Sequence, residues 1–190
     1  MPHTPVLDFL LTRRSRPAKM LSAPVPDRAE LETLLTAAVR VPDHGKLEPW
    51  RLVVLGKPAL MRIADQAEAH ARAAGLEPEK VAKSRSQFDD SPLAVVVVGS
   101  PKSIDKVPAL EQTLSAGAVC LGLVNAALAS GWGASWLSGW VAHDAAVAAD
   151  LFGLVPGEWV AGIVHIGTAR QVPPERPRPD LAAITTWVEA

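Results

Sequence analysis

Apolar residues recur three or four positions apart in five stretches of this chain, which is the spacing of one helix face. Several of these stretches begin at Thr, Asp or Pro or end at Gly, and such residues cap helices. The expected helices run from Thr4 to Leu11, from Asp27 to near Pro42, from about Pro58 to Ala74, from Pro108 to Ala129 and from Asp144 to Phe152. The pattern therefore predicts a framework rich in helices.

Three shorter apolar runs have the length of strands. They cover Leu52–Leu55, Leu93–Val98 and Trp159–Gly167. The second run contains four consecutive valines, which indicates a strand buried on both faces. We expect residues 133–139 to form a loop that enters a further short strand. Helices and strands within 190 residues of ordinary composition indicate one domain, residues 1–190.

Residues 113–142 carry no charged side chain and are numerous enough to cross the roughly 30 Å apolar core of a bilayer. Small and polar residues interrupt this segment, and neither flank has a cluster of Lys and Arg. A buried helix followed by a tight turn is therefore expected rather than a membrane span. Its small residues are spaced so that another helix can approach closely. They are Ser115, Ala118, Gly122, Ala126 and Ala129.

Charge is balanced overall but unevenly distributed. The chain has 19 Lys and Arg against 20 Asp and Glu, so it lacks the net positive field of nucleic-acid-binding proteins, and no nucleic-acid partner is expected. No Lys or Arg lies between Val107 and Ala169, whereas basic residues gather near both ends. They are Arg13, Arg14, Arg16 and Lys19, and Arg170, Arg176 and Arg178. We expect the two ends to converge on one anion.

One cysteine, Cys120, and no tyrosine limit the chemistry of the side chains. An intrachain disulfide, a thiolate zinc site and a tyrosine acid are excluded, so electron transfer would need a cofactor. The five histidines show no metal-ligand spacing with carboxylates, and no metal site is expected. The first residues do not have the pattern of a secretory signal, which points to a cytoplasmic protein.

The last twenty residues predict an extended arm. Residues 171–180 contain four prolines, and the chain then ends near the β-prone run Ile184–Val188. Because such an arm has little to pair with locally, we expect residues 171–190 to dock on a partner subunit. The polar stretch Glu77–Asp90 separates the third helix from the second strand, and whether it covers a ligand is left open.

Arg13-Arg14-Ser15 supplies two guanidinium groups and a hydroxyl within three residues, a set suited to a phosphate monoester. Basic residues at a helix end also interact favourably with the helix dipole, so a solvated helix end is the alternative. The sequence has no Gly-x-Gly-x-x-Gly and no Walker motif, which argues against a Rossmann fold and a P-loop. Arg40 and His44 flank a Pro-Asp turn and suit contact with a polar heterocycle.

Trp132, Trp136 and Trp140 recur beside glycines, a composition that allows the backbone to approach a planar ligand. Packing in the core is the alternative for each tryptophan.

Taken together, these segments resemble the FMN-dependent nitroreductases, and most closely their compact YdjA-like NAD(P)H nitroreductase subgroup. The matching segments occur in the family's order and spacing over essentially the whole chain. They are Arg13-Arg14-Ser15, Arg40-Val41-Pro42-Asp43-His44, Glu48-Pro49-Trp50-Arg51, Ser115-Ala116-Gly117, residues 131–139 and Ile166-Gly167. The segment from Arg40 to Arg51 is the most specific of them.

The resemblance implies an α+β, nitroreductase-like fold, with a mostly antiparallel central sheet flanked by helices and a C-terminal arm exchanged in a homodimer. It also implies two FMN sites built from both chains. Arg13, Arg14 and Ser15 would hold the phosphate and ribityl chain, with Arg178 as a further basic residue at the phosphate. Arg40 and His44 would reach the flavin from the partner subunit, and Trp136, Leu137 and Ser138 would lie along the ring. The segment near the nicotinamide would be Ala126, Ala127, Leu128, Ala129, Ser130 and Gly131.

The implied activity is ping-pong transfer of a hydride from NADH or NADPH through flavin N5 to a small electron acceptor, such as a nitroaromatic or quinone-like compound. No protein side chain is expected to act as a nucleophile, and Arg40 is the candidate for stabilising the reduced flavin anion. The sequence departs from the subgroup at Leu137, where an arginine is usual. Alternatives on the same fold are enone reduction, dehalogenation, flavin breakdown or flavin binding without turnover.

Overall fold

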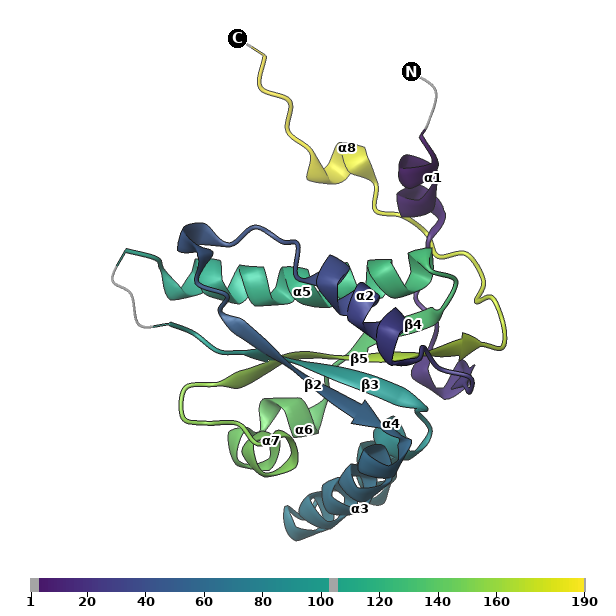
Figure 1. The fold of residues 1–190 in the computed structure, drawn as a ribbon, viewed down its shortest axis with the longest axis vertical. Helices are drawn as coiled ribbons and strands as arrows, with labels where there is room; N and C mark the ends of the chain where they lie inside the picture. The colour runs from purple at the N-terminus through teal and green to yellow at the C-terminus, as the bar shows by residue number, and fades with distance from the viewer. Residues whose placement is uncertain (1–3, 103–105, 190) are drawn as a thin grey trace.

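The computed structural model describes residues 4–102 and 106–189, and its centre is one antiparallel sheet with helices on both faces (Figure 1). The strands are β1 (Leu21–Ser22), β2 (Trp50–Gly56), β3 (Leu93–Gly99), β4 (Gly133–Leu137) and β5 (Trp159–Ala169). The helices are α1 (Pro5–Thr12), α2 (Arg28–Ala38), α3 (Lys57–Ala73), α4 (Pro78–Asp89), α5 (Ala109–Ala129), α6 (Trp140–His143), α7 (Ala145–Phe152) and α8 (Leu181–Ile184). Two short 3₁₀ turns, η1 (Ala18–Met20) and η2 (His44–Lys46), complete the described elements.

Strand β5 organises the sheet. It pairs with β3, β4 and β1, and β3 pairs in turn with β2 at the edge. All four pairings are antiparallel, which confirms the expected mostly antiparallel sheet and the α+β class. Every residue of β3 is buried, as its run of valines predicts.

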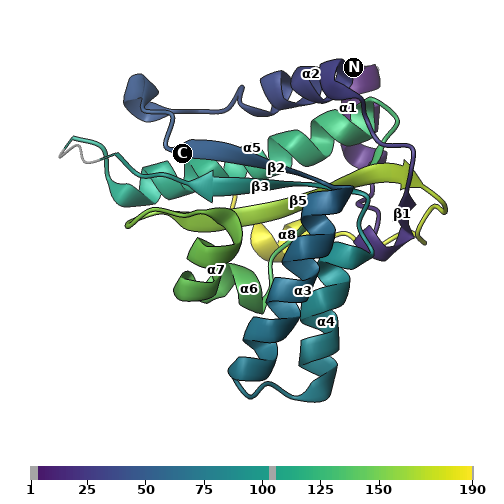
Figure 2. The same ribbon diagram turned by 60° about the horizontal axis from the view of Figure 1, so that its bottom comes forward.

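The two faces of the sheet are covered by different helices. Helices α2 and α5 lie over one face, where Leu34, Val97 and Leu123 share a core. Helices α3, α4, α6 and α7 lie over the other, around Leu60, Phe88 and Phe152 (Figure 2). The sheet therefore separates two apolar cores.

Gly122 confirms the expected close approach of a helix to the small residues of α5. A Cβ atom at this position would lie 2.7 Å from the carbonyl oxygen of Ala38, at the end of α2. Only glycine allows this contact, because backbone atoms cannot yield to a side chain. Helices α2 and α5 are thus held at short range.

Three local predictions differ from the structure. The polar stretch Glu77–Asp90 contains a helix, α4 (Pro78–Asp89), and the strand after α5 begins at Gly133 itself, without the expected loop. In the C-terminal arm, Leu181–Ile184 form one helical turn capped by Asp180. The β-prone run therefore lies partly in a helix, because a cap provides local hydrogen bonds that a lone strand lacks.

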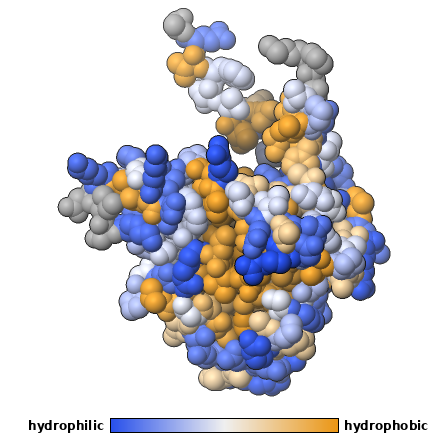
Figure 3. Space-filling model, in the orientation of Figure 1, coloured by the Kyte–Doolittle hydropathy of each residue, from blue (hydrophilic) through white to orange (hydrophobic). Residues whose placement is uncertain are grey.

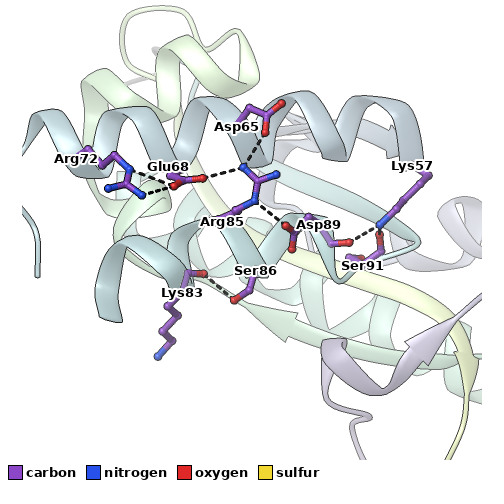
Figure 4. Close-up of polar contacts among 9 residues, drawn as sticks. All are labelled: Lys57, Asp65, Glu68, Arg72, Lys83, Arg85, Ser86, Asp89 and Ser91. Atoms are coloured by element: carbon purple, nitrogen blue, oxygen red, sulfur yellow. Dashed lines mark hydrogen bonds and ion pairs between the residues drawn. The ribbon is translucent and has the colours of Figure 1, made fainter. Parts of the chain in front are cut away.

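Charged side chains link helix α4 to α3, in addition to the apolar contacts of Phe88 (Figure 4). The guanidinium of Arg85 contacts Asp65 at 2.7 Å, Glu68 at 2.8 Å and Asp89 at 2.9 Å. Hydrogen bonds to Glu68 and Asp65 raise the pKa of Arg85, and Arg72 and Arg85 together lower the pKa of Glu68. A buried apolar set of only Val81 and Phe88 explains why apolar spacing does not reveal this helix.

Arg51, the last residue of the most specific motif, forms an ion pair within the fold. Its Nε and Nη2 atoms donate to the two carboxylate oxygens of Glu158, at 2.8 Å and 2.6 Å. This bidentate pair lowers the pKa of Glu158 to about 2. It ties the start of β2 to the turn before β5.

By length and composition, α5 is the one described helix long and apolar enough to cross a membrane. It packs against the sheet and α2 through Val119, Cys120 and Leu123, which are fully buried. Burial raises the pKa of the Cys120 thiol to about 12. The apolar composition of α5 is thus partly explained by its place in the core.

His165 on β5 is completely buried. Its Nδ1 atom lies 2.8 Å from the Ser91 hydroxyl, which itself donates to the Leu93 carbonyl, so Nδ1 carries the proton. No hydrogen-bond partner among the described residues reaches Nε2. Burial disfavours a charged ring here and lowers the pKa of His165 to about 4.

Acidification should therefore destabilise the fold through His165. Below the unfolded-state pKa of 6.5 the unfolded chain binds a proton that the folded chain refuses, so stability is full above that pH and is lost as pH falls towards 4. Between about pH 7 and pH 5 the expected loss is about 2 kcal/mol of unfolding free energy. Urea unfolding at each pH should show this loss in the wild type and in His143→Gln, whose ring is exposed. An equally steep loss in His165→Gln would contradict it.

The two ends of the chain project from the same side of the molecule (Figure 1). Their apolar side chains are exposed, including Val6 and Leu10 of α1 and Ile184, Trp187 and Val188 at the C-terminus. Trp187 is 83% exposed. Both ends thus carry the apolar side chains typical of buried segments, but these side chains are not buried within the chain.

Candidate functional site

A pocket of about 820 Å³ lies between α4, strand β4 with its continuation, and the segment that leads into η1. This volume falls within the range of about 300–1,000 Å³ typical of small-molecule sites. The N-terminal part of its lining is Ser15, Pro17, Ala18 and Lys19. The part from α4 and its flanks is Leu76, Lys80, Lys83, Ser84, Ser86, Gln87 and Asp90, and the part from β4 to the start of α6 is Ser135, Leu137, Ser138, Gly139, Trp140 and Val141.

Strand β4 forms one wall through alternate residues. Ser135 and Leu137 line the pocket, and Trp136 points to the opposite face of the sheet, as strand geometry requires. There the indole covers Gly162 of β5, where a Cβ atom would lie only 2.0 Å from the indole nitrogen. Trp136 is 42% exposed and lies outside this pocket in the single chain.

The N-terminal wall is fixed to β4 by the backbone. The amide of Arg16 donates to the carbonyl of Ala134 at 2.8 Å, which brings Ser15 to the pocket. Arg13 donates from Nη2 to the Ser15 hydroxyl at 3.4 Å. The Nε atom of Arg13 is buried, and no partner for it exists in the described part of the chain. An ionised donor without an acceptor at this point suits an anionic ligand.

Arg14 and Arg178 meet at one carboxylate. Arg14 donates to the Pro174 carbonyl and lies 3.5 Å from Glu175, and Arg178 lies 3.5 Å from the same oxygen. Arg178 also donates to the Leu11 carbonyl at 2.8 Å. The two basic ends of the chain thus come together, and the anion between them is Glu175 of the chain itself.

Helix α4 contributes pocket residues that the sequence reasoning missed. Lys80, Lys83, Ser84 and Gln87 follow the spacing i, i+3, i+4 and i+7 and so share one helix face. The Nε2 atom of Gln87 is buried and lacks a partner among residues 4–102 and 106–189. The helical spacing of these polar residues is the sequence feature that could have identified them as one face of a helix.

Arg40 and His44 lie away from the pocket. Both are exposed, and Nδ1 of His44 lies 2.7 Å from Glu111 in the first turn of α5. Strand β4 and its pocket follow the other end of α5, and 21 residues of helix span about 30 Å. One chain alone therefore does not bring His44 to Ser138.

Residues 126–131 end α5 and form the turn into β4. Ala127 is buried in the core, whereas Ala129, Ser130 and Gly131 are exposed. None of the six lines the pocket. Of the site residues expected from sequence, the structure thus brings Ser15, Leu137 and Ser138 together and places the arginine cluster next to them.

The pocket fits the flavin mononucleotide that the sequence resemblance implies. The unpartnered Arg13 Nε and the Ser15 hydroxyl suit the phosphate, and the buried Gln87 Nε2 suits a carbonyl oxygen of the ring. Leu137, Trp140 and Val141 supply apolar surface for a planar ring system. Within the described residues no group of three or more His, Cys, Asp and Glu is arranged to hold a metal ion.

Comparison with known sequences gives consistent matches. The model of the Nitroreductase family matches residues 10–168. The chain is 33% identical over 162 residues to "Putative NAD(P)H nitroreductase YdjA" of Escherichia coli K12, covering 85% of this chain and 87% of that protein. It is 36% identical over 167 residues to "Putative NAD(P)H nitroreductase" of Haemophilus influenzae, covering 87% and 89%.

Solved structures show the same fold. A nitroreductase-like family protein of Bacillus cereus superposes with a TM-score of 0.80 at 21% identity, over 100% of this chain and 99% of that one. A structure described as a putative nitroreductase in complex with FMN, from Desulfovibrio desulfuricans, superposes with a TM-score of 0.76 at 20% identity, over 99% of each chain.

Proposed function

The chain belongs to the nitroreductase family, and from this premise we propose that it is an FMN-dependent oxidoreductase using NADH or NADPH. Its proposed acceptors are nitroaromatic or quinone-like compounds. The observation that carries the proposal is the pocket: one end offers Ser15 to a phosphate, with the buried, unpartnered Nε of Arg13 close to it, and another wall offers the buried donor of Gln87. Bound FMN would supply the redox chemistry by accepting a hydride and passing it on, with reductant and acceptor using the same place in turn.

The protein's part is to bind, orient and exclude water. Arg13 and Arg14 would bind the phosphate, with Ser15 on the phosphate or ribityl chain and Arg178 as a further basic group. Ser138 and the backbone of β4 would lie along the ring, and Leu137 would exclude water from it. Leu137 also removes the charge of the subgroup's arginine, so the pocket wall at this point favours uncharged acceptor rings.

A homodimer completes the proposed site. Leu110, Leu114 and Leu121 form an exposed apolar stripe on α5, and the face seen in Figure 3 shows apolar surface at its centre and on the projecting ends. If α5 packs antiparallel on its copy across a two-fold axis, the first turn of one α5 lies beside the last turn of the other. That arrangement brings Arg40 and His44 of the partner towards the pocket.

Exchange of the arm, residues 171–190, would cover the apolar side chains that project from each end. The nicotinamide-proximal segment 126–131 and Trp136 would then lie near the two-chain site rather than at the surface. We propose a cytoplasmic dimer that acts on small molecules, without nucleic-acid or membrane partners.

The test is purification without added flavin, followed by reduction and turnover. Bound FMN should give the flavin absorption bands, NADH or NADPH should bleach them anaerobically, and a nitroaromatic or quinone should restore them. Protein that neither carries nor takes up FMN would refute the proposal. Flavin that is reduced but reoxidised by an enone or a haloaromatic, with nitro compounds at background rate, would favour the alternative chemistries. Flavin that is never reduced would favour a binding module.

A further inference from the structure

Helix α4 has two polar faces with different neighbours. The face with Arg85 turns towards α3, where it meets Asp65 and Glu68 (Figure 4). The other face, with Lys80, Lys83 and Gln87, lines the pocket. In Figure 4 the side chain of Lys83 extends away from the ion pairs of α3.

The lysines on the pocket face have no carboxylate of their own. Among the described residues no ion pair within 4.0 Å involves Lys80, Lys83 or Lys19, which joins them from η1. Arg85 engages Asp65 and Glu68 of α3 and Asp89 of α4, so these three carboxylates are paired away from the lysines. Asp90 is the acidic residue in the lining, against three lysines. The pocket wall therefore carries net positive charge.

Lys80 lies along α4 from the part of the pocket proposed to bind the flavin ring. Gln87 is close to β4, since its Oε1 atom would be 3.0 Å from a Cβ atom on Gly139. Lys80 lies seven residues earlier on α4, about 10 Å along the helix axis. Helices α3 and α4 project away from the sheet (Figure 2), so Lys80, near the start of α4, lies farther from the sheet than Gln87.

We propose that Lys80 and Lys83, supported by Lys19, form a subsite for an anionic group of the substrate that binds next to the flavin. The proposal rests on the proposed function and names its substrate class: the subsite favours NADPH, whose additional phosphate lies far from the nicotinamide ring, over NADH. An electron acceptor that carries a carboxylate would offer these lysines an anionic group of the same kind.

The test uses the FMN-loaded enzyme with Lys80→Gln/Lys83→Gln and, as a control of equal charge change, Lys102→Gln/Lys106→Gln, two exposed lysines outside the pocket. Each exposed charge pair changes affinity by about two- to five-fold, so the double variant should lower the NADPH-to-NADH ratio of kcat/KM by about four- to 25-fold. The control should keep the wild-type ratio. Raising the salt concentration should lower the wild-type ratio in the same direction.

A binding measurement separates this subsite from the activity. Quenching of tryptophan fluorescence by NADP⁺ and NAD⁺ should show the same loss of preference in the double variant, whether or not the enzyme turns over. Equal NADP⁺ and NAD⁺ preference in wild type and variant would overturn the NADPH assignment. A fall confined to nitrobenzoate, relative to uncharged nitrobenzyl alcohol, would assign the subsite to the acceptor and overturn the choice of NADPH. Absence of FMN would refute the proposed function alone.

Discussion

Replacing both Arg13 and Arg14 by alanine should weaken FMN binding by about 100- to 10,000-fold. Charged hydrogen bonds contribute about 1.5–3 kcal/mol each, and Arg13 contacts Ser15 at the proposed phosphate end of the pocket, with Arg14 next to it in the chain. Arg13 Nε has no described partner to compensate in the flavin-free chain. Flavin fluorescence titration of the apoprotein measures the change.

Two further variants test the same assignment, one with the opposite expected effect on FMN binding and one with no expected effect. Glu175→Gln removes the carboxylate that lies 3.5 Å from both Arg14 and Arg178, so it should strengthen FMN binding. Arg28→Ala removes an exposed arginine on α2 and should leave binding unchanged. If the double variant keeps wild-type affinity while its circular dichroism is normal, the arginines belong to a solvated helix end.

Deleting residues 179–190 should raise the dimer dissociation constant by at least 1,000-fold. The deleted segment carries Leu181, Ile184, Trp187 and Val188, all more than half exposed in the single chain. Burial of such side chains contributes about 1.5–3 kcal/mol each before the cost of ordering the arm. Sedimentation velocity over a range of protein concentrations gives the dissociation constant.

Trp187→Ala is the graded control, since it removes one of these side chains and should have a smaller effect in the same direction. FMN retention should fall together with dimerisation in the deletion variant, because Arg40 and His44 would no longer reach the site. A truncated chain that sediments like the full chain would show that the arm does not hold the subunits together.

The fold was largely predictable where one local signal dominates. Thr4, Asp27 and Asp144 cap α1, α2 and α7 as their positions indicate, and Gly153 ends α7 in the left-handed conformation. The valines of β3 have the burial that the run implies. These elements depend on backbone hydrogen bonds and apolar burial, both of which are visible within a short window of sequence.

Helix α4 and the arm were not predictable in the same way. The α4 helix depends on Arg85 and its carboxylates from α3, and such pairs become neighbours only after folding. Convergence of the basic ends was expected, but the anion between them, Glu175, depends on the path of a proline-rich segment. Contacts across subunits cannot be obtained from the periodicity of one chain.

Polar contacts join the α3–α4 hairpin at its base and between its two helices. Lys57, at its base, donates to the carbonyl oxygens of Asp89 and Ser91, and the ion pairs of Arg85 join the two helices to each other. The hairpin is thus joined by ion pairs of its own as well as by its part in the apolar core, while β4, another wall of the pocket, belongs to the sheet. We therefore expect changes of charge on the outer face of this hairpin to leave the proposed phosphate end of the pocket unaffected.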